Sequence, residues 1–167
     1  MAYGEFLLNK TRLMILLMYL TFGCAENPLQ VGSSDDWQLL PHCLYYSGRD
    51  KGTEIVSVQQ SSLRAVLSNF ETGEADLLDV SQPGKIARIQ RFNLGLRADE
   101  ELTSVAFHPS LDVFAAVIDA GNRPGRLELH AASNGQLLEH VEVGFGPDAV
   151  VFSKEGNVIL VANEGED

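Results

Sequence analysis

The stretch ELTSVAFH, residues 101–108, decides the fold because each half of it recurs elsewhere in the chain. The first half, Glu-x-x-Ser-Val, also begins at residue 54, a step of 47 residues from 54 to 101. The second half, Val-Ala-Phe-His, returns as Val-Val-Phe-Ser at 150–153, a step of 45 residues from 105 to 150. A four-stranded propeller blade takes about 40–50 residues, so both steps match a blade. An immunoglobulin-like sandwich, the runner-up, has no reason to repeat at this length.

Around this stretch, short β-rich runs alternate with Gly, Pro and Asn turn clusters every 8–12 residues or so. No sustained helical period is visible between residues 54 and 167. We therefore expect an all-β fold, a partial β-propeller of about two and a half four-stranded antiparallel blades over 51–167. The expected strands are 54–59, 63–69, 75–80, 86–94, 102–107, 113–119, 126–131, 138–143, 148–152 and 158–163.

The hairpin over 126–143 has a register that the sequence predicts. A two-residue Asn-Gly loop would put Leu129 opposite His140 and break the apolar alternation of the two strands. A three-residue loop, 133–135, restores it and puts Gly135 at the left-handed position that such loops need. This register makes two complementary cross-strand pairs, Arg126 with Glu142 and Glu128 with His140.

The N-terminus has the pattern of a signal peptide over residues 1–23. Lys10 and Arg12 precede an apolar run of ten residues, 13–22. A membrane-spanning helix needs about 20 apolar residues, so this run is too short to span and suits a signal peptide. Residues 24–50, which contain turn residues and no clear period, are expected to form a tether and lead-in. The chain is therefore expected to be exported.

Two ways of processing the signal stay open. Gly23-Cys24 resembles a bacterial lipobox, although Phe22 is bulkier than that pattern prefers, and Cys24 would then carry the lipid. Gly23-Cys24-Ala25 also fits ordinary cleavage after Ala25. Lipidation would leave Cys43 as the only thiol of the mature chain, whereas an unmodified Cys24 could pair with it. The expected location is the bacterial cell envelope, lipid-anchored, or the secreted fraction.

The charge of the chain excludes two classes of partner. The formal net charge is −11, and the carboxylates are spread along the sequence. Such a surface repels phosphate backbones, so we expect no nucleic acid partner. It also disfavours docking on anionic lipid headgroups by charge alone.

Candidate sites for metals and catalysis are few. Asn163, Glu164, Glu166 and Asp167 supply the hard oxygen ligands that Ca²⁺ prefers. They are sequential rather than convergent, so a solvated turn is the better interpretation and Ca²⁺ is only a weak candidate. We expect no catalytic residue, no metal site and no cofactor.

The remaining reactive side chains do not form a recognisable constellation. The four histidines, His42, His108, His130 and His140, are separated along the predicted strands and turns. The carboxylate run 99–101 is adjacent rather than opposed, which favours a surface loop. Ser104 and Ser153 lie outside any nucleophile-elbow motif.

The C-terminal stretch resembles a known family. GPDAVVFS (146–153), Gly156 and LVANEGE (160–166) are similar to the propeller of the choice-of-anchor I family, as are 52–69 and 77–81. The resemblance implies an extracellular or envelope propeller of unsettled biochemical role, with some phosphatase- or phytase-like members. Members continue for several more blades, whereas this sequence stops at Asp167.

Two and a half blades would leave strand edges uncovered, which is an aggregation hazard. We therefore expect either a truncated reading frame, with missing downstream blades, or self-assembly. The expected function is a binding or structural role without catalysis, with a protein or glycan as the partner. The alternative is the N-terminal fragment of a propeller hydrolase, phosphatase- or phytase-like or lactonase-like, with metal-binding carboxylates.

Overall fold

The computed structural model describes residues 52–82 and 84–165, the strands 4–8, 15–17 and 37–39, and the positions Tyr45 and Ser47. All ten runs expected from the sequence are strands. They are β4 (Thr53–Gln59), β5 (Arg64–Asn69), β6 (Glu74–Gln82), β7 (Lys85–Asn93), β8 (Glu101–Phe107), β9 (Val113–Ala120), β10 (Arg123–Ala131), β11 (Leu137–Glu142), β12 (Pro147–Phe152) and β13 (Ile159–Asn163). A single 3₁₀ turn, η1 (Phe70–Thr72), lies among these described elements.

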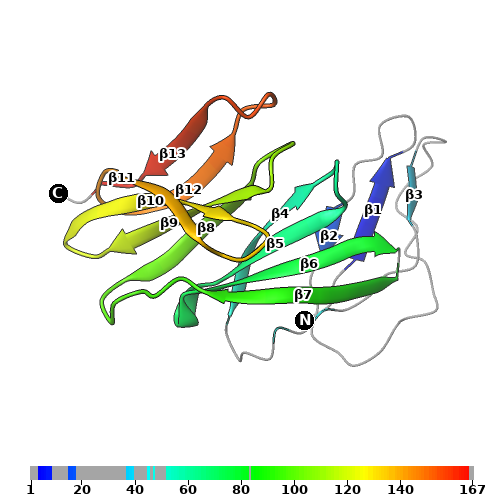
Figure 1. The fold of residues 1–167 in the computed structure, drawn as a ribbon, viewed down its shortest axis with the longest axis horizontal. Coiled ribbons are helices and arrows are strands. Elements are labelled where there is room, and N and C mark those ends of the chain that lie inside the picture. Colours follow the sequence, from blue (N-terminus) through cyan, green and yellow to red (C-terminus); the bar gives the residue numbers. More distant parts are fainter. Residues whose placement is uncertain are drawn as a thin grey trace. The chain divides into compact units, whose positions relative to one another are not determined.

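These strands form three antiparallel sheets in chain order (Figure 1). The first blade is β4-β5-β6-β7, the second is β8-β9-β10-β11, and the third consists of β12 and β13. The first strand of each sheet lies beside the first strand of the next, since β8 contacts both β4 and β12. Sheets of four, four and two strands confirm the expected partial propeller.

A separate small unit contains the N-terminal strands. β1 (Gly4–Leu8) pairs antiparallel with β2 (Ile15–Leu17) and with β3 (Trp37–Leu39), in the order β2-β1-β3. β1 and β2 fall within the predicted signal segment, and export stays a prediction. Among the residues described, there is no helix with the length and apolarity needed to traverse a bilayer.

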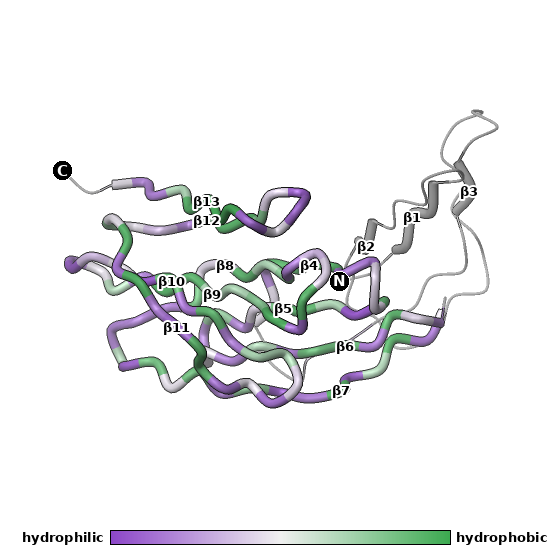
Figure 2. Tube along the Cα trace, turned by 45° about the horizontal axis from the view of Figure 1, so that its top comes forward, coloured by the Kyte–Doolittle hydropathy of each residue, from purple (hydrophilic) through white to green (hydrophobic). Residues whose placement is uncertain are grey.

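The second blade buries both of its faces. Phe114, Ala116 and Ile118 of β9 point to the first blade and pack in one cluster with Val66 and Leu77. The alternate residues of β9 point to the third blade, where they form a second cluster. Its members are Ala106, Ala115, Val117, Leu127 and Val150. β9 is therefore apolar on both sides, and Figure 2 shows hydrophobic residues along this strand.

The predicted register of the β10–β11 hairpin is confirmed over most of its length. Arg126 lies opposite Glu142, Glu128 opposite His140, and Gly135 has a φ of +74°. A bulge between Leu129 and His130 then shifts the pairing by one residue. The loop is consequently 132–135 rather than 133–135, because the Ala131 amide already donates to the Gln136 carbonyl.

Most strand starts differ from the expected ones by one residue, and the starts of β5 and β10 differ for a clear physical reason. β5 begins at Arg64 because Leu63 has a φ of 51°, a left-handed conformation that belongs to the preceding turn. β10 begins at Arg123, although Pro124 and Gly125 favour a turn. A register shift between Arg123 and Arg126 accommodates these two residues within the strand.

Candidate functional site

The inner strands of the three blades line a groove of about 520 Å³. β4, β8 and β12 each contribute, and the turns after them close one end. The lining residues are 55–58, 60, 105–107, 109 and 150–154. Because the first strands of neighbouring blades lie side by side, this groove is where a propeller has its central channel.

Serine side chains of one blade accept hydrogen bonds from backbone amides of the first strand of the next blade. The Ser57 hydroxyl accepts a hydrogen bond from the Phe107 amide at 2.9 Å, and the Ser104 hydroxyl accepts one from the Val150 amide at 3.3 Å. These are the two serines of the repeated Glu-x-x-Ser-Val motif. The repeat therefore encodes a contact between blades, which fixes the spacing of the strands that line the groove.

Gln59 makes the most extensive polar contact between the first two blades. Its buried side-chain amide donates to the His108 carbonyl at 2.5 Å and to the Leu111 carbonyl at 2.8 Å. Its Oε1 atom accepts from the Ser62 hydroxyl at 2.5 Å and from the Arg64 guanidinium at 3.2 Å. All the hydrogen-bonding capacity of this side chain is thus used to hold the turns at the groove rim.

The groove differs in charge from the rest of the chain. Among its lining residues, all of which the structure describes, there is no Asp or Glu, and Lys154 is the single charged side chain. The whole chain has a net charge of −11. Apolar side chains alternate there with the polar groups of Ser57, Gln60 and Ser153. This lining suits an uncharged or carboxylate-bearing ligand.

His108 has a structural role beside the groove. Its Nδ1 atom accepts hydrogen bonds from the amides of Ser110 at 3.1 Å and Leu111 at 2.8 Å, and its ring packs edge-on against Phe152 at 5.0 Å. Ser153, its counterpart in the repeat, holds the equivalent turn with its own side chain, since its hydroxyl accepts from the Val158 amide at 3.2 Å. The backbones also match, because each residue donates to the carbonyl five positions on.

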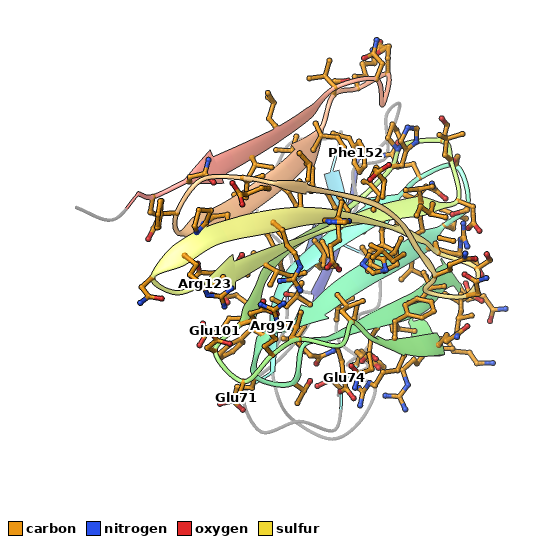
Figure 3. All side chains as sticks on the ribbon, turned by 60° about the vertical axis from the view of Figure 1, so that its left-hand side comes forward. Glu71, Glu74, Arg97, Glu101, Arg123 and Phe152 are labelled. Atoms are coloured by element: carbon orange, nitrogen blue, oxygen red, sulfur yellow. The ribbon has the colours of Figure 1, made fainter. Side chains whose placement is uncertain are left out.

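The carboxylate run 99–101 is not simply a surface loop, as the sequence suggested. Asp99 pairs with Arg123 at 2.6 Å and Glu101 is exposed, but the Glu100 side chain is buried and lies 2.7 Å from Arg126. Burial would raise the pKa of Glu100, but hydrogen bonds from Arg126 and the Arg97 backbone outweigh it and lower that pKa. Figure 3 shows Arg97, Glu101 and Arg123 together, away from Phe152 of the groove.

Two further ionic contacts were not expected from the sequence. Arg91 binds the fully buried Asp76 through two nitrogens, at 2.6 and 2.7 Å. On β10, Glu128 accepts from Arg126 at 2.7 Å, and its Oε2 atom lies 2.8 Å from His130 Nε2. Strand alternation already places these three β10 residues on one face, but their burial depends on the neighbouring blade.

The weak Ca²⁺ candidates do not converge on a site within the described residues. Asn163 and Glu164 are exposed at the end of β13, and the Glu164 amide donates to the Gly146 carbonyl at 2.7 Å. Glu166 and Asp167 lie outside the described residues, as do His42, Cys24 and Cys43. In the part of the chain that is described, no three His, Cys, Asp or Glu side chains are grouped to hold a metal ion.

Comparison with known proteins supports the same fold. A solved structure, the periplasmic gluconolactonase of Pseudomonas aeruginosa, matches with a TM-score of 0.55 at 20% identity. The match covers 76% of this chain and 35% of that one, so the chain spans about a third of its length. At this identity the likeness shows the propeller fold alone. No curated protein matches the sequence. The model of the choice-of-anchor I domain matches residues 54–167, and the chain therefore belongs to that family.

Proposed function

We propose that this chain is an exported, envelope-associated propeller module that binds a protein or glycan in the groove and carries out no catalysis there. The observation that carries the proposal is the lining of the groove, which is apolar and hydroxyl-bearing, with one lysine and no carboxylate. Such a surface recognises a ligand by apolar contact and a few polar groups. Choice-of-anchor domains are typical of exported or cell-surface proteins, which supports the location.

Lys154 provides the sharpest test of the groove. The full chain is titrated against purified envelope polysaccharides and against extended peptides, and the heat of binding is measured. Lys154→Glu should weaken the binding roughly two- to fivefold, the effect of losing one exposed ionic contact. Lys85→Glu, on exposed β7, makes the same change in net charge outside the groove lining and should bind like the wild type. Equal affinities of all three proteins for a carboxylate-bearing ligand would refute its binding in the groove.

A lactonase-like hydrolase is the second candidate function. It is favoured by the likeness to a structure named as a gluconolactonase. The discriminating assay is hydrolysis of gluconolactone by the purified chain, with and without added Ca²⁺. Turnover above the uncatalysed rate, lost on chelation, would support the hydrolase and overturn the proposed binding role without catalysis.

The envelope location has its own test. A bacterium expressing the complete sequence is fractionated, and the mass of the mature chain is measured. We expect loss of residues 1–23 and a lipid on Cys24, with Cys24→Ala moving the protein from the membrane to the soluble fraction. An uncleaved, unmodified chain in the cytosol would contradict export.

We further propose that the outward face of β12 and β13 is covered, either by self-assembly or by another blade. Val151, which also borders the groove, and Leu160 lie opposite each other on this face and are 51% and 62% exposed. Paired apolar exposure of this kind marks an interaction surface. Sedimentation of the wild type against a Val151→Asp, Leu160→Asp double variant tests self-assembly, which would be refuted by a monomeric wild type.

A further inference from the structure

A row of ionisable residues lies along the inward face of β10. Arg126, Glu128 and His130 alternate along the strand, so they share one face. Their partners on β9 are Ile118, Ala116 and Phe114, which belong to the core cluster between the first and second blades. The row therefore lies in the seam between these blades rather than in the groove.

His130 is held in this seam by three direct contacts. Its Nε2 atom lies 2.8 Å from Glu128 Oε2, and its Nδ1 atom lies 3.0 Å from the Gly135 carbonyl oxygen. The ring stacks on Phe114 at 5.2 Å, and Phe114 stacks in turn on Phe92 of the first blade at 5.7 Å. Gly135 itself lies against Phe92, where an added Cβ would overlap the ring.

Both nitrogens of His130 face hydrogen-bond acceptors. A backbone carbonyl can only accept, and an ionised carboxylate can only accept. Burial by itself would raise the pKa of Glu128, but hydrogen bonds from His130 and Arg126 outweigh it and lower that pKa. The Arg126 guanidinium, 2.7 Å from Glu128 Oε1, favours the ionised carboxylate. A neutral imidazole has one N–H and could satisfy only one of the two oxygens. The imidazolium has two and satisfies both.

The surroundings of His130 contain one charged group in direct contact. That group is Glu128 on its own strand, with Arg126 and then Glu100 behind it. From β9 the ring meets Phe114, with Phe92 of β7 beyond it, and from the β10–β11 loop it meets a carbonyl oxygen. The nearest charged group and the nearest carbonyl both present a hydrogen-bond acceptor to the ring.

We propose that His130 is a proton-dependent clasp between β10 and the β10–β11 loop. With two ring protons it ties Gly135 to Glu128 and holds the loop against Phe92. The carboxylate is the stronger acceptor, so after loss of one proton the remaining N–H stays on Nε2. The Nδ1 lone pair then faces the Gly135 carbonyl oxygen at 3.0 Å, that tie becomes repulsive, and the loop is released. The proton goes to solvent, and no other group needs to change its protonation state.

The test follows the loop and the ring separately. Amide hydrogen exchange at Gly135, whose N–H donates to the Ala131 carbonyl, reports opening of the loop. Its protection factor, measured from about pH 5 to pH 8, should be roughly two- to tenfold lower at the alkaline end, the effect of losing one hydrogen bond. Ring nitrogen NMR of the wild type should show His130 doubly protonated at the acidic end.

Variants separate this histidine from the others. His130→Gln should remove the pH dependence of Gly135 protection, whereas His140→Gln, at an exposed position of β11, should leave it intact. A neutral His130 ring at about pH 5, or an unchanged pH profile in His130→Gln, would overturn the proposal. If His130→Gln does not fold, the ring spectrum of the wild type still decides.

Discussion

Replacement of Gln59 by glutamate should strongly weaken the contact between the first two blades, although the two side chains have nearly the same size. The substitution keeps the shape of the side chain but removes the two donated hydrogen bonds to the carbonyls of His108 and Leu111, at 2.5 and 2.8 Å. Instead of an N–H, a carboxylate oxygen would then face each carbonyl oxygen. Gln60→Glu, on the exposed neighbouring residue, adds the same charge without touching these carbonyls.

The expected loss of stability follows from the hydrogen bond that each of the two carbonyls loses. A buried polar group left without its partner costs about 1–3 kcal/mol. The bond to His108 is buried and the bond to Leu111 is partly buried, so the two together should cost roughly 2–4 kcal/mol. Domains are stable by only about 5–15 kcal/mol, so this is a large fraction of the total. In a domain of this size it corresponds to a fall in Tm of roughly 5–15 °C.

The assay is urea unfolding of both variants and the wild type, followed by fluorescence, with thermal melts at several pH values. Protonation of the introduced carboxyl group would return one donor, so the loss should shrink as the pH falls. If Gln59→Glu is within about 0.5 kcal/mol of Gln60→Glu, the side chain of Gln59 does not hold the blades together.

Three other perturbations have expected outcomes. The lowered pKa values of Glu100 and Glu128 make their ion pairs stabilising above the ordinary value of 4.5, so stability should fall progressively as the pH drops below it, measured by thermal melts. Gly156→Ala should lose about 1–3 kcal/mol in urea unfolding, because φ is +78° and a Cβ would overlap the His108 ring. Phe114→Ala, at a fully buried ring, should lose about 3–5 kcal/mol in the same measurement.

Each of these has a matched control. Glu128→Gln should reduce the fall in stability at acid pH. An unchanged dependence of stability on pH would show that the ion pairs of Glu128 do not cause that fall. Gly121→Ala has the same left-handed strain with open space around it, so it should lose less than Gly156→Ala. Phe145→Ala, at a 40% exposed ring, should lose far less than Phe114→Ala, and equal losses would argue against a continuous core across the seam.

The sequence predicted the strands because turn residues separate them so regularly. It also predicted the β10–β11 pairing, since a shift of one residue would expose Leu127 and Leu129. The bulge near His130 was missed, because a bulge changes only the backbone locally and leaves the alternation nearly intact. The strand was expected to begin at Arg126, because Pro124 and Gly125 are poor strand formers, whereas β10 includes both.

The contacts between blades could not be predicted in the same way. The repeat identified Ser57 and Ser104 as equivalent, but their partners, the amides of Phe107 and Val150, are 50 and 46 residues away. Glu100 was assigned to an exposed acidic run, whereas Arg126 and the surrounding blade bury it. The spacing of residues along a chain shows which residues of one strand share a face. The partners described here depend instead on how whole sheets pack against one another.

The serine bonds also have a direction. In both seams the acceptor hydroxyl belongs to the earlier blade and the donor amide to the later one. The N-terminus of a chain leaves the ribosome first. The acceptor serine of each seam is therefore synthesised before the strand whose amide it binds. The amides of Phe107 and Val150 need no later residue as their partner. The blades can therefore form one after another during synthesis, and each blade already formed provides the acceptor for the first strand of the next blade.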